Sequence, residues 1–176
     1  CPVQLETRVE RILHENARVT AVDVLHHGSV TRLDVSALIS TMPLRDLVRA
    51  LSPAAPAHVR DAAERLRYRD FFTVALIINE PTLFPDNWIY VHDPAVKLGR
   101  IQNFKNWSPD LVPDPQQTCL GLEYFCFEGD GLWNMSDEEL VELGRRELAA
   151  IRLADPAKVV DGAVVRQPKA YPIYDE

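Results

Sequence analysis

The sequence has few of the residues that build disulfide frameworks. Its 176 residues include only three cysteines. Cys119 and Cys126 fall within one predicted strand at an odd spacing, so their side chains point to opposite faces and cannot pair. We therefore expect small buried thiols in a reducing compartment, which predicts a cytoplasmic protein.

Signals for two further classes of protein are missing. Lysine and arginine number 19 against 26 aspartate and glutamate residues, for a formal net charge of −7. Binding to nucleic acid needs a basic face, so we expect no nucleic-acid partner. The longest apolar run, residues 71–78, is much shorter than the roughly 20 residues of a membrane helix, which predicts no membrane span.

Short catalytic and phosphate-binding motifs are missing too. The sequence contains no Gly-x-Gly-x-x-Gly, P-loop, His-Glu-x-x-His, Gly-x-Ser-x-Gly or Cys-x-x-Cys pattern. The adjacent His26 and His27 fall at a predicted hairpin tip, where such a pair is more often solvated than bound to a metal. We therefore expect no metal site and no self-contained nucleotide site.

The residues that are present predict an α+β fold, because strands and helices are grouped apart rather than alternating. Residues 37–40 (ALIS) are apolar except for Ser40, as in a buried parallel strand. Three prolines between residues 108 and 117 predict a rigid, non-helical loop. The predicted strands span residues 3–13, 18–25, 29–35, 37–40, 71–78, 87–92, 98–103, 118–128 and 159–165, and the predicted helices span residues 44–51, 57–66 and 137–152.

The densest candidate site lies in the stretch from Asn87 to Phe127. Between Gly99 and Trp107, apolar residues alternate with amides and cations, a pattern that suits the wall of a pocket for a polar organic molecule. The alternative is an amphipathic strand with a decorated loop. The polar members of this stretch can hold a carboxylate or phosphate through charge-assisted hydrogen bonds, or can form a plain polar sheet face. They are Arg100, Gln102, Asn103 and Lys105.

Glu123 is the most informative carboxylate of this stretch. On its predicted strand it shares a face with Gly121 and Phe125, an apolar setting that would raise its pKa. The alternative is a structural ion pair, because a buried carboxylate is costly unless it is paired. Its candidate partners are Arg69, Arg100 and Lys105. No residue stands out as a catalytic base, so the catalytic residues stay unassigned.

Several segments resemble flavin-dependent amine oxidases. Within that superfamily they are most similar to bacterial proteins of the protoporphyrinogen-oxidase-like and UDP-galactopyranose-mutase-like branch. The similarity covers essentially the whole chain and is specific to the branch, not to a substrate. The segments that carry it are residues 37–44 (ALISTMPL), 84–115 (FPDNWIYVHDPAVKLGRIQNFKNWSPDLVPDP), 118–140 (TCLGLEYFCFEGDGLWNMSDEEL) and 164–175 (VVRQPKAYPIYD).

The resemblance implies a division of the chain. Residues 1–43 would be a β-hairpin or meander of the FAD domain and its crossover, and residues 44–160 the substrate-binding domain. That domain would be a mixed, largely antiparallel sheet flanked by helices, and residues 161–176 would begin the return to the FAD domain. The chain would then be an internal fragment, which explains the missing Gly-x-Gly-x-x-Gly pattern.

The resemblance also implies site residues and a function. The function is that of an FAD-dependent oxidoreductase acting on a small organic substrate, with the fragment itself inactive and without FAD. The alternatives are a fragment of a mutase-like flavoenzyme acting on a nucleotide sugar, and a non-catalytic binding domain; the oligomeric state is not indicated. The implied cofactor-binding residues are Val9, Thr41, Pro43, Pro168, Lys169 and Tyr171. The implied substrate-binding residues are Arg100, Gln102, Asn103, Lys105, Glu123 and Tyr124.

Overall fold

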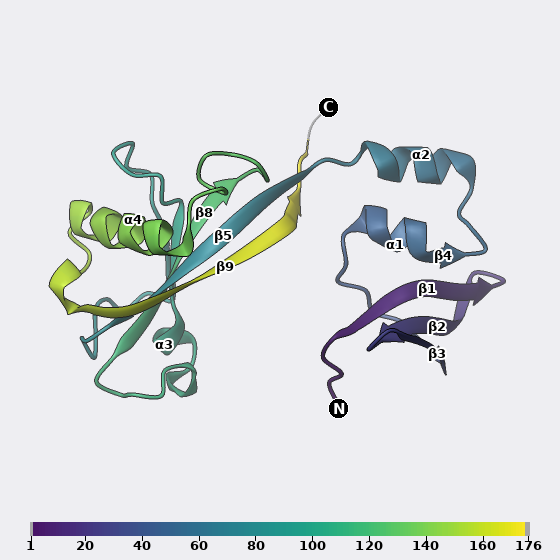
Figure 1. The fold of residues 1–176 in the computed structure, drawn as a ribbon, viewed down its shortest axis with the longest axis horizontal. Coiled ribbons are helices and arrows are strands. Elements are labelled where there is room, and N and C mark those ends of the chain that lie inside the picture. The colour runs from purple at the N-terminus through teal and green to yellow at the C-terminus, as the bar shows by residue number, and fades with distance from the viewer. Residues whose placement is uncertain (1, 175–176) are drawn as a thin grey trace. The chain divides into compact units, whose positions relative to one another are not determined.

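The chain forms two units, which meet in sequence between Arg67 and Tyr68. Figure 1 shows the computed structural model, which describes residues 2–174. Each unit has its own sheet and its own helices, and the predicted α+β class is confirmed. The division of function at residue 44 that the resemblance implies is a separate matter and stays a prediction.

The first unit is built on a four-stranded sheet in the order β3-β2-β1-β4. The predicted hairpin is confirmed, with Gly28 in the left-handed region at φ +80° in its turn. The first strand begins at Thr7 rather than at residue 3. The strands are β1 (Thr7–Glu15), β2 (Arg18–His26), β3 (Ser29–Asp34) and β4 (Leu51–Ser52), and β4 runs parallel to β1.

One face of this sheet packs against helix α1 (Leu44–Ala50). Ile12, Val22 and Val24 form the buried cluster, and Leu47 of α1 packs against it. Helix α2 (Ala57–Arg65) contacts α1, and an ion pair between Arg49 and Glu64 at 2.6 Å links the two helices.

The predicted strand at residues 37–40 is wrong. These residues form a loop, and the side chain of Ile39 is 93% exposed. A wholly apolar parallel strand forms only between neighbours that pair with its backbone. No described segment pairs with residues 37–40, so their composition alone did not produce a strand.

A buried carboxylate stabilises the opposite face of the first sheet. Asp23 alternates with the core residues of β2 and is only 2% exposed. Arg32 on β3 donates to it at 2.8 Å, and Arg11 on β1 lies at 2.7 Å. The hydrogen bond from Arg32 holds the pKa of Asp23 below its ordinary value, and its effect outweighs the opposing effect of burial.

We expect this carboxylate to make the first unit acid-sensitive. Because the folded pKa of Asp23 lies below its ordinary value of 3.8, its contribution to stability is present above that pH and is lost as the pH falls further. Acid titration followed by circular dichroism should show the loss. Asp23→Asn should weaken the acid dependence, whereas Asp61→Asn on α2 should not. An identical acid profile for Asp23→Asn and the parent chain would contradict this assignment.

The second unit contains a five-stranded sheet in the order β6-β7-β8-β5-β9, in which every neighbouring pair is antiparallel. β5 lies between two neighbours, as its apolar composition predicted. The last strand extends to Pro172 instead of ending near residue 165, because it pairs with β5 along most of its length. The strands are β5 (Tyr68–Ile78), β6 (Trp88–Tyr90), β7 (Arg100–Asn103), β8 (Thr118–Cys126) and β9 (Val159–Pro172).

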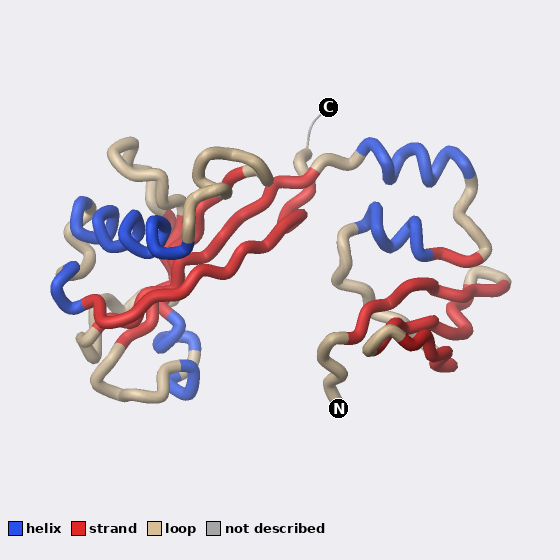
Figure 2. The backbone as a smooth tube through the Cα atoms, in the orientation of Figure 1, coloured by secondary structure: helices blue, strands red, loops and turns tan. Residues whose placement is uncertain are grey.

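Helix α4 (Asp137–Ala150) lies across one face of this sheet (Figure 2). Its predicted capping box is confirmed, with Ser136 accepting from the amide of Glu139 and Glu139 accepting in return. Two helix residues, Leu140 and Leu148, complete the core. The sheet contributes Phe72, Val74, Leu76, Ile78, Ile101, Leu120, Leu122, Tyr124 and Cys126 to the same buried cluster.

Three shorter helices lie in the loops of the second unit. Helix α3 (Phe104–Trp107) follows β7, and a 3₁₀ helix, η1 (Pro109–Leu111), lies in the loop that the prolines marked as non-helical. That expectation was therefore wrong for η1, because a proline is tolerated in the first turn of a helix, where its missing N–H has no partner to lose. A second 3₁₀ helix, η2 (Pro156–Lys158), precedes β9. No helix within residues 2–174 is both long enough and apolar enough to cross a membrane.

Close packing of α4 on the sheet depends on Gly144. A Cβ at this position would lie 2.9 Å from a methyl carbon of Leu122 and 3.3 Å from one of Val74, both in the core. Gly144→Ala should therefore lower the free energy of unfolding by about 1–3 kcal/mol, although alanine normally favours a helix. Urea denaturation would measure the change. Gly131→Ala is the matched control, since no atom lies within 4 Å there, and equal effects of the two substitutions would exclude the packing explanation.

Candidate functional site

The candidate site lies on the face of the five-stranded sheet opposite α4, which we call the open face. Strand register places Tyr90, Arg100, Glu123 and Thr73 side by side across four strands of this face. The neighbouring row contains small residues, and Phe104 of α3 packs against one of them, Gly121. α3 thus covers one end of the open face, while Tyr90 stays exposed and Arg100 partly exposed in the next row.

A buried carboxylate organises the polar residues of the open face. Glu123 is 2% exposed, and its Oε2 accepts from Nε of Arg100 at 2.7 Å while Gln102 donates to Oε1 at 2.5 Å. Of the alternatives left open by the sequence, the ion pair of Glu123 with Arg100 is confirmed. Both carboxylate oxygens of Glu123 thus accept a hydrogen bond from a side chain of β7.

Arg100 connects this network to the strand at the other side of the sheet. One of its terminal nitrogens donates to the hydroxyl of Tyr171 at 3.2 Å. Burial lowers the pKa of Arg100, but its hydrogen bonds to Tyr171, Tyr90 and Glu123 outweigh burial and raise the pKa above its ordinary value. The guanidinium is therefore a permanent and oriented positive charge on the open face.

A cavity of about 580 Å³ lies beside Arg100. Aromatic rings dominate its lining, and those of Phe125 and Tyr171 lie 6.1 Å apart. The two cations of the lining, Arg69 and Arg100, lie over the rings of Phe127 at 5.5 Å and Tyr90 at 5.8 Å. We call this cavity the aromatic pocket; it is lined by Arg69, Tyr90, Arg100, Phe125, Phe127, Tyr171, Pro172, Ile173 and Tyr174.

Two of the predicted substrate-binding residues face the core instead. Asn103 shares the buried face of β7 with Ile101, and its Oδ1 has no hydrogen-bond partner among residues 2–174. Tyr124 is fully buried and stacks on Phe72 at 5.0 Å. Burial, and next the carboxylate of Glu147, raise the pKa of Tyr124. Strand alternation explains both positions, since neighbours of open-face residues point the other way.

Lys105 is separated from the network by its own contacts. Its Nζ donates to the carbonyl oxygens of Pro81, Pro115 and Gln117 at 2.9, 2.6 and 2.8 Å. These three bonds use all the donors of a lysine ammonium, and they tie two loops to the end of β7. The structure therefore brings together Arg100, Gln102 and Glu123 of the predicted substrate-binding set.

The predicted cofactor-binding residues are divided between the two units. In the first unit, β4 pairs only with Ile12 and Leu13, so this edge of β1 has no strand partner at Val9 within the described chain. The cofactor-binding role that the resemblance implies for Val9 stays a prediction. Thr41 and Pro43 lie in the segment that leads into α1.

In the second unit, Pro168 and Lys169 form a bulge in β9, where the pairing with β5 shifts register. Lys169 has a φ of +53° there. Tyr171 follows the bulge and lines the aromatic pocket. The bulge changes the course of the strand at the point where Tyr171 meets Arg100.

Asp70 holds the backbone beside the aromatic pocket in place, a role that the sequence did not reveal. It is 7% exposed at the start of β5, and its two oxygens accept from the amides of Glu128 and Lys169 at 2.7 and 2.6 Å. It thereby holds both the bulge and the turn after β8 beside the pocket. The available signal was a charged residue directly before an apolar strand, which is too common to mark a site.

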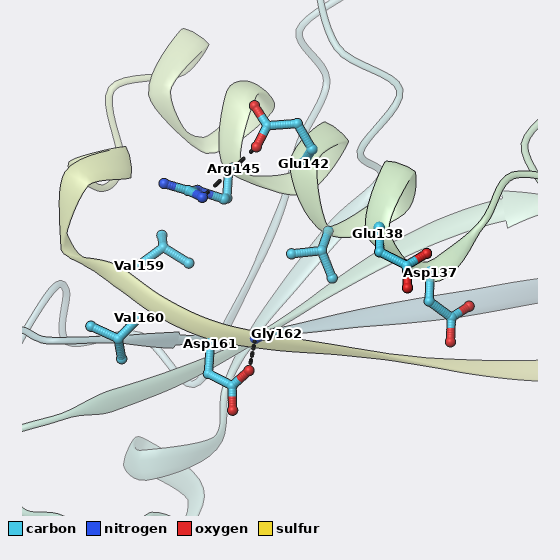
Figure 3. Close-up of a pocket in the computed structure, with 9 residues that line it drawn as sticks. Asp137, Glu138, Glu142, Arg145, Val159, Val160, Asp161 and Gly162 are labelled. Atoms are coloured by element: carbon cyan, nitrogen blue, oxygen red, sulfur yellow. Dashed lines mark hydrogen bonds and ion pairs between the residues drawn. The ribbon is translucent and has the colours of Figure 1, made fainter.

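A smaller cavity of about 380 Å³ lies between α4 and β9 (Figure 3). Its carboxylates include Asp137 and Glu138 in the first turn of α4, where they complement the helix dipole. Arg145 turns toward Glu142 and pairs with it at 3.8 Å. None of the predicted site residues lines this cavity, and its other two carboxylates are Glu142 in the second turn of α4 and Asp161 on β9.

Comparison with known proteins identifies the family. The family model for flavin containing amine oxidoreductases matches residues 1–171. The chain therefore belongs to the flavin containing amine oxidoreductase family, and the resemblance noted in the sequence is confirmed. None of the curated proteins compared with the chain matches it.

Solved structures share the fold at low sequence identity. A reduced UDP-galactopyranose mutase has a TM-score of 0.68 at 19% identity, covering 94% of this chain and 34% of its own. A candidate protoporphyrinogen oxidase from Exiguobacterium sp. 255-15 has a TM-score of 0.59 at 19% identity, covering 97% and 36%. A putrescine oxidase bound to putrescine has a TM-score of 0.57 at 16% identity, covering 90% and 33%. The chain thus spans about a third of the length of these structures.

We expect Glu123→Gln to destabilise the second unit. The substitution leaves the partly buried guanidinium of Arg100 without its carboxylate, and breaking such a pair costs about 3 kcal/mol of unfolding free energy. Urea denaturation followed by circular dichroism would measure the loss. Glu128→Gln, the same change at an exposed position just after β8, should alter stability by less than about 0.5 kcal/mol. Equal stability of Glu123→Gln and the parent chain would rule out a structural pair.

Proposed function

We propose that this chain is the substrate-domain part of an FAD-dependent oxidoreductase and that its open face forms one wall of the substrate pocket. Membership of the flavin containing amine oxidoreductase family supports the cofactor. The substrate is a small organic molecule, and the division at residue 44 separates the FAD-domain strands from the substrate domain. The protein acts in the cytoplasm.

The observation that carries this proposal is the network of Glu123, Arg100 and Gln102 beside the aromatic pocket. Its side chains are fixed by mutual hydrogen bonds, and fixed polar groups in an apolar cavity are what orient a small ligand. A cavity of about 580 Å³ is within the range of small-molecule sites.

The residues of the chain have a limited part in the chemistry. FAD, when bound, would accept a hydride from a C–H bond of the substrate as the adjacent C–N or C–C single bond becomes a double bond, while a proton leaves the neighbouring atom. Arg100 and the aromatic rings would bind and orient the substrate, and Glu123 would keep the guanidinium in position. Val9, Thr41 and Pro43 in the first unit, and the bulge with Tyr171 in the second, would contact the cofactor.

The absorption spectrum of the longer protein that carries this sequence tests the proposal. We expect a flavin spectrum that bleaches on adding dithionite, whereas the 176-residue chain should bind no stoichiometric flavin. Arg100→Lys in the longer protein should lower kcat/KM by about tenfold with unchanged flavin content, because lysine lacks the planar fork that binds a carboxylate twice.

Other outcomes would assign a different function. Activity only with reduced flavin and a nucleotide sugar, without net oxidation, would indicate a mutase-like enzyme. A longer protein that stays colourless after FAD is added would indicate a binding domain without catalysis. Stoichiometric flavin in the purified 176-residue chain would show that the chain holds a complete cofactor site.

A further inference from the structure

The charge of the aromatic pocket has one sign. Arg69 and Arg100 are its only ionised side chains among the nine residues that line it in the described part of the chain. The nearest carboxylate of the network, Glu123, lies beneath Arg100 with both oxygens in hydrogen bonds. A ligand in this pocket therefore meets guanidinium groups and no free carboxylate.

The two arginines differ in how firmly they are held. Arg100 is fixed by Glu123 and Tyr171, and its side chain is 20% exposed. Arg69 lies over the ring of Phe127 at 5.5 Å and is exposed. No carboxylate among residues 2–174 forms an ion pair with Arg69, so it can pair with a ligand without breaking such a contact. Of the two arginines, Arg69 is thus the one available to bind an anionic group of a ligand.

The remaining lining is mostly aromatic. Tyr90, Phe125 and Tyr171 present rings to the cavity, and Phe125 and Tyr171 both lie near a third ring, that of Phe71, at 6.3 and 6.0 Å. Ring faces of this kind bind unsaturated, planar bodies through stacking and edge contacts. A cationic group would instead be repelled by the guanidinium groups, which disfavours amines.

We propose that the aromatic pocket selects a planar, unsaturated organic anion, with its carboxylate or phosphate at Arg69 and its flat body against Tyr90, Phe125 and Tyr171. This inference rests on the proposed function, because it names the substrate class of the same pocket. The name of the family would lead one to expect a preference for amines, and the inference predicts the opposite charge for the ligand of this pocket.

Binding of four naphthalene probes to the purified 176-residue chain tests the inference. The probes share one flat body and differ in charge: 2-naphthoate, 2-naphthyl phosphate, protonated 2-naphthylmethylamine and neutral 2-naphthamide. Equilibrium dialysis at moderate ionic strength should show at least one anion bound about tenfold more tightly than the amine, since a hydrogen bond to a charged group contributes about that much. The preferred anion then distinguishes a carboxylate from a phosphate ligand.

Two arginine substitutions locate the effect. Arg69→Gln should weaken binding of the preferred anion about tenfold and leave 2-naphthamide unchanged, because only the charged contact is lost. Arg146→Gln is the matched control, since Arg146 is exposed on α4, across the sheet from the pocket. Arg69 is exposed, so the variant should fold, and circular dichroism would verify this. Higher salt should weaken the binding of the two anions and leave the binding of 2-naphthamide unchanged.

Each contrary result has a separate meaning. Equal or tighter binding of the amine would overturn the inference. Tight binding of all four probes, unaffected by Arg69→Gln, would also overturn it while leaving the pocket as an apolar binding site. Binding of none of them would overturn it and remove the support that the pocket gives to the proposed function. The flavin spectrum of the longer protein is independent of all three results.

Discussion

The arrangement of the second unit depends on one physical requirement: the buried carboxylate of Glu123 needs hydrogen-bond partners. Glu123 lies in the middle of β8 with 2% exposure, where an unpaired charge would cost several kcal/mol. Arg100 and Gln102 on β7 supply the partners, and this requirement fixes their rotamers on the open face. The same constraint that stabilises the sheet therefore orients the guanidinium that faces the aromatic pocket.

Two further carboxylates act on the backbone rather than on side chains. Asp70 accepts from the amides of Glu128 and Lys169, and Glu147 of α4 accepts from the amides of Lys97 and Leu98 at 2.9 and 3.0 Å. Charge-assisted bonds of this kind hold irregular segments in one conformation. The irregular segments next to these strands are thus anchored to the sheet and to α4, which gives the site on the open face a rigid support.

Sequence patterns predicted most of the second unit because its signals are local. The capping box at Ser136, the period of α4 and the apolar run of β5 each depend on neighbours within a few residues. The predicted strand at residues 37–40 failed because its formation depends on pairing with another segment, which composition does not report. For the site, the sequence marked Arg100 and Glu123 as candidates but could not choose the partner of Glu123 from three cations.

By itself, the sequence determined the α+β class, the positions of most strands and the family, because these follow from local periodicity and from motifs that stay together along the chain. Only the tertiary structure decided which polar residues share a face. Gln102 and Asn103 are adjacent in sequence, yet strand alternation sends one to the open face and the other to the core. Asp70 and Lys169 are far apart in sequence and meet only because β5 pairs with β9.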